Sequence, residues 1–189
     1  MAHARPAREF PTPASWTVKE GRDGYLAENQ FTLEAYDAPS TEASVLGFAF
    51  SVPNTPRHRW GIMLHDLHHV ATGYGTDVFG EAEVSAWELR RGLRNLGPYV
   101  GSIVLVGALA GLLIAPRRTL RAFLASGSGR SSLFADASSY DDLLVLRVGE
   151  LRARLGIPEG GVATGPRGLH SLVREGKSGA PVGASAPGA

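Results

Sequence analysis

Residues 65–81 have the sequence HDLHHVATGYGTDVFGE, which contains the end of one helix and the start of another. The first helix is predicted from about Pro56 to Thr72 and should end at Gly73, because glycine tolerates the left-handed backbone that closes a helix. Asp77 can cap a second helix over about 78–95. The stretch therefore predicts two helices joined by a short loop, and we expect an all-α fold.

Four side chains in this stretch carry the nitrogen and oxygen donors of a metal site. At 100° per residue, His69 lies about 40° and Asp66 about 100° from His65, so all three share one helix face. Glu81 opens the next helix. Two imidazoles and two carboxylates suit a divalent metal, zinc first, with iron or manganese as alternatives. The simpler alternative is that the histidines are hydrogen-bonded helix residues and the aspartate faces solvent.

Other polar residues of the two helices have weaker assignments. His68 lies about 60° from His65, on the side away from Asp66, and is a candidate partner of a metal ligand or a proton carrier. A core or solvent-facing histidine is the plainer interpretation. Glu83 and Glu88 are expected to face water, and Trp87 is expected to pack in the core. No catalytic residue is assigned.

The spacing His-Asp-x-x-His, eleven residues, Glu resembles the signature of the fourth Coq protein family of ubiquinone (coenzyme Q) biosynthesis. The resemblance continues through GYGTDVFG (73–80), AEVSAWELRRGL (82–93), APRR (115–118) and ELRARLGIP (150–158), and covers roughly residues 25–158. The first fifty residues match loosely, and RHRWGIML (57–64) stands where the family has an aromatic run. The chain thus resembles a divergent bacterial-type member.

That resemblance implies a metal-dependent protein that acts on polyprenylated ring precursors. The implied chemistry is oxidative decarboxylation with ring hydroxylation, or the organisation of a biosynthetic complex at the membrane. The implied partners are a prenylated quinone precursor or another isoprenoid lipid, that complex, and a second copy of the chain. Two alternatives remain: a non-catalytic lipid-binding scaffold with a structural metal, and a metal enzyme recruited to other small-molecule chemistry.

Tyr99–Ala115, YVGSIVLVGALAGLLIA, is a run of seventeen residues without a charge. This length is at the lower edge of a membrane span. We expect a buried core helix or the wall of a lipid-binding tunnel, in preference to a helix that contacts or crosses a bilayer. The predicted lipid-binding residues are Val104, Leu105, Ala108 and Leu112. The arginines at 117, 118 and 121 are candidates for contact with anionic headgroups or a diphosphate, or form a solvated helix start.

Composition narrows the class of protein. The 189 residues suggest one domain, and the net charge of +1 gives no argument for nucleic acid. The chain has no cysteine, which excludes disulfides and thiolate ligands. The N-terminal MAHARPAREFPTP lacks the apolar stretch of a secretory signal. We expect a cytoplasmic protein, with a peripheral position at the inner face of the membrane as a variant.

The domain prediction has three parts. Residues 1–24 are expected to be a flexible N-terminal segment, 25–158 a helical domain with the metal site, and 159–189 a disordered tail rich in glycine, alanine and proline. Within the domain, further helices are predicted over Tyr25–Tyr36, about 98–114, the segment RRTLRAFLAS (117–126), and Ser139–Leu155. LGFAFSV (46–52) is a candidate strand, and GLHSLVRE (168–175) a candidate helical turn.

Three other enzyme classes share part of the motif, and the sequence argues against each. Membrane di-iron enzymes use His-x-x-His-His boxes but need several, and only His3, His58 and His170 remain here. Zinc proteases place Glu where this chain has Asp66. Phosphohydrolases with a His-Asp pair need a ligand histidine on a separate upstream helix, and His58 is too close in sequence to supply it.

Overall fold

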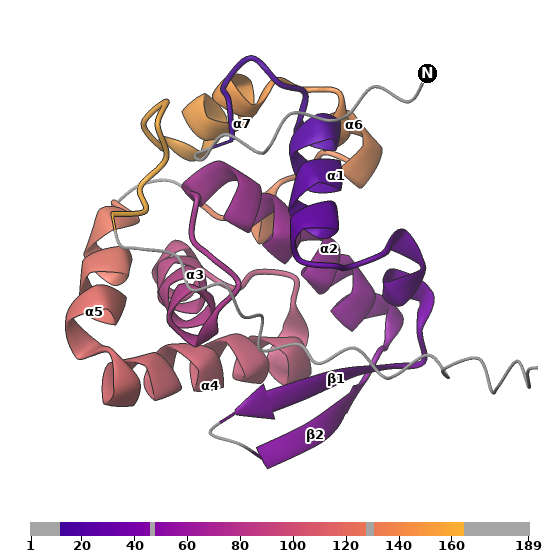
Figure 1. Cartoon of the computed structure of the whole chain (residues 1–189), viewed down its shortest axis with the longest axis vertical. Coiled ribbons are helices and arrows are strands. Elements are labelled where there is room, and N and C mark those ends of the chain that lie inside the picture. The colour runs from indigo at the N-terminus through magenta and orange to yellow at the C-terminus, as the bar shows by residue number, and fades with distance from the viewer. Residues whose placement is uncertain (1–11, 46–47, 128–130, 165–189) are drawn as a thin grey trace, which may run out of the picture.

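The computed structural model describes residues 12–45, 48–127 and 131–164, and one helix, α2 (Pro56–Thr72), runs through the middle of the molecule. Helices α1, α3, α4 and α7 contact it (Figure 1). The remaining helices of the described chain are α1 (Val18–Glu28), α3 (Val78–Arg91), α4 (Gly97–Ile114), α5 (Pro116–Ala125), α6 (Tyr140–Leu144) and α7 (Val148–Leu155), with short 3-10 helices η1 (Leu33–Asp37) and η2 (Leu133–Ala135). The all-α prediction is confirmed.

Helix α2 has the predicted bounds because both of its ends carry strong local signals. The Thr55 side chain accepts a hydrogen bond from the His58 backbone N–H at 3.1 Å, and Pro56 occupies the first turn. Gly73, with φ of 86°, ends the helix in the left-handed region. The last six residues of α2, from Leu67 to Thr72, are all buried. This half of α2 is therefore core on every side.

The loop between α2 and α3 is tightly folded. Asp77 caps α3 by accepting hydrogen bonds from the backbone N–H groups of Phe79 and Gly80 at 2.8 and 3.1 Å. A Cβ at Gly80 would lie 2.1 Å from the carbonyl oxygen of Gly75, so only glycine permits this approach. The first turn of α3 is thus held against the loop, and this contact places Glu81.

The N-terminal part of the chain is ordered earlier than predicted. Helix α1 begins at Val18, because Thr17 and Glu20 form a capping box in which each side chain bonds the backbone N–H of the other. The helix expected over Tyr25–Tyr36 ends at Glu28, and η1 follows as a separate element. Residues 18–24 therefore belong to the folded domain and not to a flexible segment; residues 1–11 lie outside the described chain.

A hairpin connects η1 to α2. Strands β1 (Ser40–Val45) and β2 (Phe48–Pro53) pair antiparallel, with Ser40 opposite Pro53 (Figure 1). The predicted strand at 46–52 is confirmed from Phe48 onward, while 46–47 lie outside the described residues. The Asn54 side chain donates to the backbone carbonyls of Tyr36 and Ala38 at 3.1 and 3.0 Å, which fixes the base of the hairpin.

Helix α4 lies at the surface, which differs from the predicted core helix or tunnel wall. It is the one described helix long and apolar enough to cross a membrane, and 22% of it is buried. Its buried side packs on α3, where a Cβ at Gly107 or Gly111 would lie 2.6 Å from Ser85 or Ala82. The two glycines therefore bring α4 against α3, and no described element covers the other side.

The predicted helix Ser139–Leu155 is broken in two. Between α6 and α7 the chain pairs with the segment before α1: Val18 N–H donates to the Leu146 carbonyl, and Val148 N–H to the Trp16 carbonyl, both at 2.8 Å. These bonds need an extended backbone, so the helix cannot continue through Arg147. Tertiary pairing overrides the apolar helical pattern at this point.

Residues 159–164, predicted to belong to the disordered tail, pack on the end of α2. The backbone N–H groups of Val162 and Ala163 donate to the Thr72 carbonyl at 2.9 and 3.1 Å. The buried Arg152 side chain donates to the Ala71 carbonyl at 2.9 Å. These bonds satisfy carbonyls at the C-terminus of α2 that have no partner within the helix. The tail from 165, with the segment 168–175, lies outside the described residues.

The close approach at Gly80 predicts a clear stability effect. Gly80→Ala should lower the free energy of unfolding by about 1–3 kcal/mol, because the methyl group meets backbone that cannot rotate away. Gly101→Ala in α4 is the matched control: the added methyl meets only Leu93 at 3.7 Å. That change should be neutral or stabilise by up to about 1 kcal/mol. Urea unfolding of both variants checks this, and equal stabilities would contradict it.

Candidate metal site

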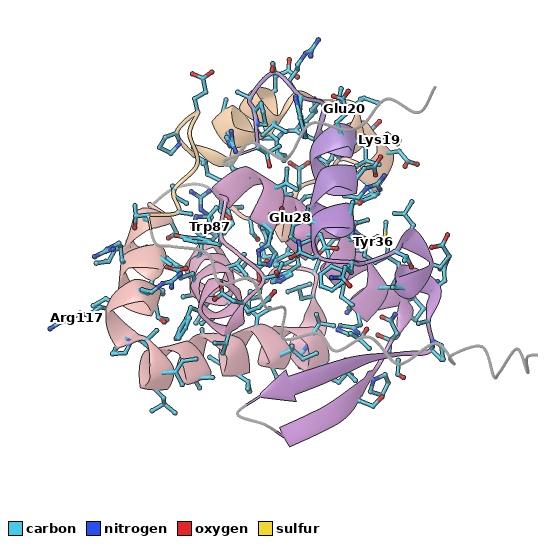
Figure 2. The ribbon with its side chains drawn as sticks, in the orientation of Figure 1. Lys19, Glu20, Glu28, Tyr36, Trp87 and Arg117 are labelled. Atoms are coloured by element: carbon cyan, nitrogen blue, oxygen red, sulfur yellow. The ribbon has the colours of Figure 1, made fainter. Side chains whose placement is uncertain are left out.

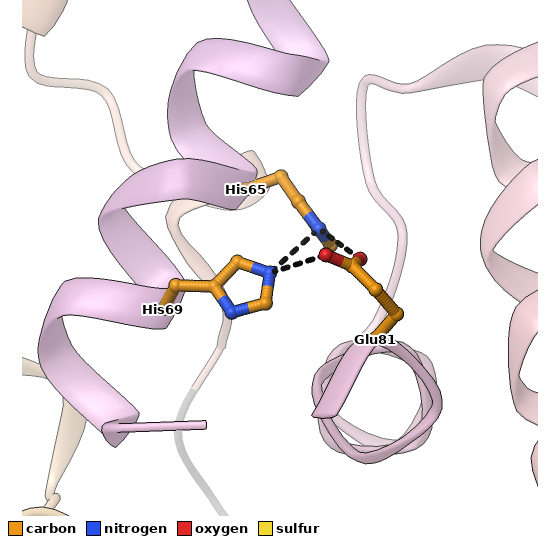
Figure 3. Close-up of side chains that lie close together, drawn as sticks. All are labelled: His65, His69 and Glu81. Atoms are coloured by element: carbon orange, nitrogen blue, oxygen red, sulfur yellow. Dashed lines mark hydrogen bonds and ion pairs between the residues drawn. The ribbon is translucent and has the colours of Figure 1, made fainter. Parts of the chain in front are cut away.

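Three of the four predicted metal ligands converge between α2 and α3. Ligand atoms of His65, His69 and Glu81 all lie within 4.8 Å of one another (Figure 3). The Nε2 atoms of the two histidines are 3.1 Å apart, and the Glu81 carboxylate lies 3.2 Å from His65 Nε2 and 3.5 Å from His69 Nε2. The two histidines are one helical turn apart on α2, and Glu81 stands in the first turn of α3.

The second nitrogen of each histidine is already bonded. His65 Nδ1 lies 2.9 Å from Oε1 of Glu88, and His69 Nδ1 lies 3.1 Å from the backbone carbonyl of Tyr74. Carboxylate and carbonyl oxygens only accept hydrogen bonds, so the Nδ1 atom of each histidine carries a proton. In a neutral imidazole the Nε2 atom then has a free lone pair, which is available to a metal ion. Two nitrogens bound to one tetrahedral ion lie about 3.3 Å apart. The donors therefore fit one divalent metal.

Asp66, the fourth predicted ligand, lies outside this group. Its buried carboxylate accepts a hydrogen bond from the Tyr36 hydroxyl. Burial raises the pKa of Asp66, although that hydrogen bond and the neighbouring histidines oppose the shift. The 100° step between adjacent helix residues turns Asp66 away from the direction that His65 and His69 share. The structure thus brings three predicted ligands together and gives the fourth a different partner.

Glu88 and Glu83 are buried, so the prediction that they face water is wrong. Oε1 of Glu88 accepts from His65 Nδ1 at 2.9 Å and from His68 Nδ1 at 2.6 Å. Glu83 is paired with Arg118 on α5 through two hydrogen bonds of 3.0 and 2.6 Å. The sequence spacing could have identified Glu88. It follows Glu81 by seven residues, which is about 20° short of two helical turns, so both side chains lie on the same face of α3.

His68 acts through Glu88 and makes no contact with the converging donors. Its Nδ1 donates to Glu88, and its Nε2 accepts from the backbone N–H of Leu133 at 3.0 Å. Burial lowers the pKa of His68 despite the Glu88 carboxylate, so the ring is neutral at neutral pH. Both nitrogens are occupied, which supports a positioning role for His68. The predicted packing of Trp87 in the core is confirmed (Figure 2).

His65, Glu81 and Glu88 form a compact cluster of ionisable side chains. Burial raises the pKa values of Glu81 and Glu88, but the adjacent histidines outweigh it and lower both to about 2. Burial alone would lower the pKa of His65, yet the Glu88 and Glu81 carboxylates raise it well above the usual value. The two carboxylates therefore favour the protonated form of His65.

Two edges of the site reach solvent. The His65 and Glu81 side chains are 23% and 28% exposed, whereas His69 is fully buried. The Tyr25 ring stacks on His69 with ring centroids 5.3 Å apart, and closes the inner side. A metal held by the three residues would have a position accessible from the His65–Glu81 edge.

The four predicted lipid-binding residues of α4 are divided between two environments. Val104 and Ala108 are buried, while Leu105 and Leu112 are exposed. A surface cavity of about 520 Å³ is lined by Thr55, Pro56, Arg57, Trp60 and Asn95, none of which belongs to α4 or to the metal site. None of the four predicted lipid-binding residues lines this cavity.

Comparisons of the chain with protein-family models, with curated proteins and with solved structures give no match.

The buried Glu88 carboxylate should control metal affinity. Glu88→Gln removes the charge that orients His65, and loss of such an indirect partner lowers metal affinity about 10–100-fold. The matched control is Glu159→Gln, since Glu159 is exposed. Competition with a chromogenic chelator measures both affinities. Equal affinity of the two variants would show that Glu88 does not position the ligand.

Metal binding should release a proton. Because the pKa of His65 is raised, a metal must displace the His65 proton, and the apparent affinity should rise with pH by about tenfold per unit below that pKa. Isothermal titration calorimetry at pH 7 in buffers of different ionisation enthalpy counts the protons. A count of zero would contradict a protonated His65.

Proposed function

We propose that this chain binds one divalent metal ion through His65, His69 and Glu81 and acts on a polyprenylated ring precursor, as the fourth Coq protein family does. The observation that carries the metal site is the pair of Nε2 atoms 3.1 Å apart beside one carboxylate, with each Nδ1 bonded elsewhere. The spacing of the motif carries the assignment to ubiquinone-type chemistry.

The donor set favours a catalytic site over a structural one. Structural zinc sites have four protein ligands, whereas catalytic zinc has three and an open position. Two histidines and one carboxylate are also the ligands of non-haem iron(II) oxygenases. Since Asp66 is bonded to Tyr36, three protein ligands remain. Zinc stays the first choice, and iron is the alternative that suits a reaction with dioxygen.

A metal held by His65, His69 and Glu81 would supply a Lewis-acid position for the carboxylate or phenol oxygen of the ring. In the balanced reaction the carboxyl group leaves as carbon dioxide, water supplies the oxygen of the new hydroxyl, and dioxygen accepts the two electrons and leaves as hydrogen peroxide. Glu88 and the Tyr74 carbonyl hold the two imidazoles in the required tautomer. Asp66 with Tyr36 provides a buried acid pair beside the ligand histidines. The substrate ring enters from the exposed His65–Glu81 edge, and the protein works in the cytoplasm.

Metal content tests the site. His69→Ala and Glu81→Ala should each reduce bound metal to a trace while the far-UV circular dichroism stays helical, because each removes one of three donors. His58→Ala is the matched control: it removes a histidine of the same helix that lies outside the converging group. Elemental analysis of the purified proteins gives the stoichiometry. Full metal occupancy in His69→Ala would refute the site.

Asp66→Asn separates catalysis from metal binding. Asn can still accept from the Tyr36 hydroxyl, so the variant should keep its metal, yet it should lose turnover at least tenfold if the acid is needed. The assay supplies a prenylated hydroxybenzoate, dioxygen and Zn²⁺, Mn²⁺ or Fe²⁺, and follows loss of the carboxyl group. Loss of metal would make Asp66 a ligand after all. Tight lipid binding without product in wild-type protein would favour the non-catalytic scaffold.

A further inference from the structure

Exposed large apolar side chains are concentrated on two consecutive helices. Of the twelve such residues in the described chain, nine lie on α4 and α5. They are Tyr99, Ile103, Leu105, Val106, Leu109, Leu112, Leu113, Leu120 and Leu124, and together they form what we call the α4–α5 face. Leu113, at the junction of the two helices, is 82% exposed. Monomeric soluble proteins rarely expose a contiguous apolar patch of this kind without a use for it.

The α4–α5 face cannot be buried by a small shift of α4. Gly107 and Gly111 seat the opposite side of α4 directly on Ser85 and Ala82 of α3. Helices α4 and α5 both pack on α3, on two of its sides (Figure 1). Their outer sides are therefore uncovered by any element of the described residues, and a partner beyond these elements must cover them.

The charges on this face have one sign. The segment 97–125 contains no aspartate or glutamate, and its only charged residues are Arg117, Arg118 and Arg121. Arg118 is neutralised by Glu83, whereas Arg117 makes no ion pair with any described residue and projects away from the molecule (Figure 2). Among the described residues, Arg121 bonds only the Thr164 hydroxyl, at 3.2 Å. A partner surface that fits this face must therefore be apolar and carry negative charge.

We infer that the α4–α5 face docks on an anionic lipid bilayer, with α4 lying in the interface and Arg117 and Arg121 at the level of the phosphates. Helix α5, with Leu120 and Leu124 beside its arginines, has the amphipathic pattern of such interfacial elements, and the uncharged α4 adds apolar area next to it. A second copy of the chain fits less well. A two-fold contact would bring the arginines of both copies into one interface with no carboxylate to pair them. This inference goes beyond the proposed function and does not depend on it.

Flotation of the full chain with lipid vesicles tests the inference. The protein should bind vesicles of phosphatidylcholine with 30% phosphatidylglycerol and bind pure phosphatidylcholine at least about tenfold more weakly, since each arginine near an anionic surface contributes about fivefold. Leu113→Glu should weaken binding to the anionic vesicles by roughly tenfold or more. Val145→Glu is the matched control, because Val145 is 76% exposed at the end of α6, outside the face.

Charge reversal gives an independent result. Arg117→Glu should lower binding to anionic vesicles by roughly tenfold or more, because it removes one favourable charge and adds one unfavourable charge. Lys19→Glu on α1 is the control with the same change of charge; Lys19 and Arg117 lie on different sides of the molecule (Figure 2). Leu124→Glu provides a second apolar variant, and circular dichroism verifies that every variant is folded.

Three results would overturn the inference. Equal vesicle binding by Leu113→Glu and Val145→Glu would show that the α4–α5 face does not contact the bilayer. A dimer by light scattering that Leu113→Glu dissociates, with no vesicle binding by the wild type, would make the face a self-association interface. Resistance to extraction by alkaline carbonate would mean that α4 spans the bilayer and does not lie in its interface.

Discussion

The arrangement of α2 and α3 depends on one buried carboxylate, that of Glu88. A carboxylate without water is unstable unless it is paired and hydrogen-bonded, and here one oxygen accepts from both His65 and His68. These two bonds fix the rotation of α3 about its axis relative to α2. Because Glu81 lies on the same face two turns earlier, the same rotation aims its carboxylate at His65 and His69.

The backbone around the site is built to hold this rotation. Gly73 ends α2, and the contact of Gly80 with Gly75 holds the first turn of α3 against the loop. Residues 159–164 and Arg152 complete the hydrogen bonds at the C-terminus of α2. The candidate ligands therefore stand on two packed helices, and the Nδ1 atom of each histidine is already held by a hydrogen bond.

Helix α3 serves both of the surfaces to which we assign a role. One of its sides carries Glu81 and Glu88 and faces α2, while Ala82 and Ser85 meet the glycines of α4. The apolar α4–α5 face and the metal site are thus separated by a single helix.

Local sequence determined the bounds of α2, from Pro56 to Thr72, and the cap of α3 at Asp77. The capping residues that start and end these helices act within one turn of chain, so they can be recognised without the tertiary structure. Local sequence also placed His65, His69 and Glu81, whose helical phase and loop length suffice. Only the tertiary structure decided the partners of Asp66 and Glu88, since Tyr36 and His68 reach them from distant parts of the chain. It likewise broke the helix at Arg147, which pairs with Thr17 in an antiparallel bridge. It also left one side of α4 without a covering element among the described residues, because long-range packing decides which side of an apolar helix meets protein.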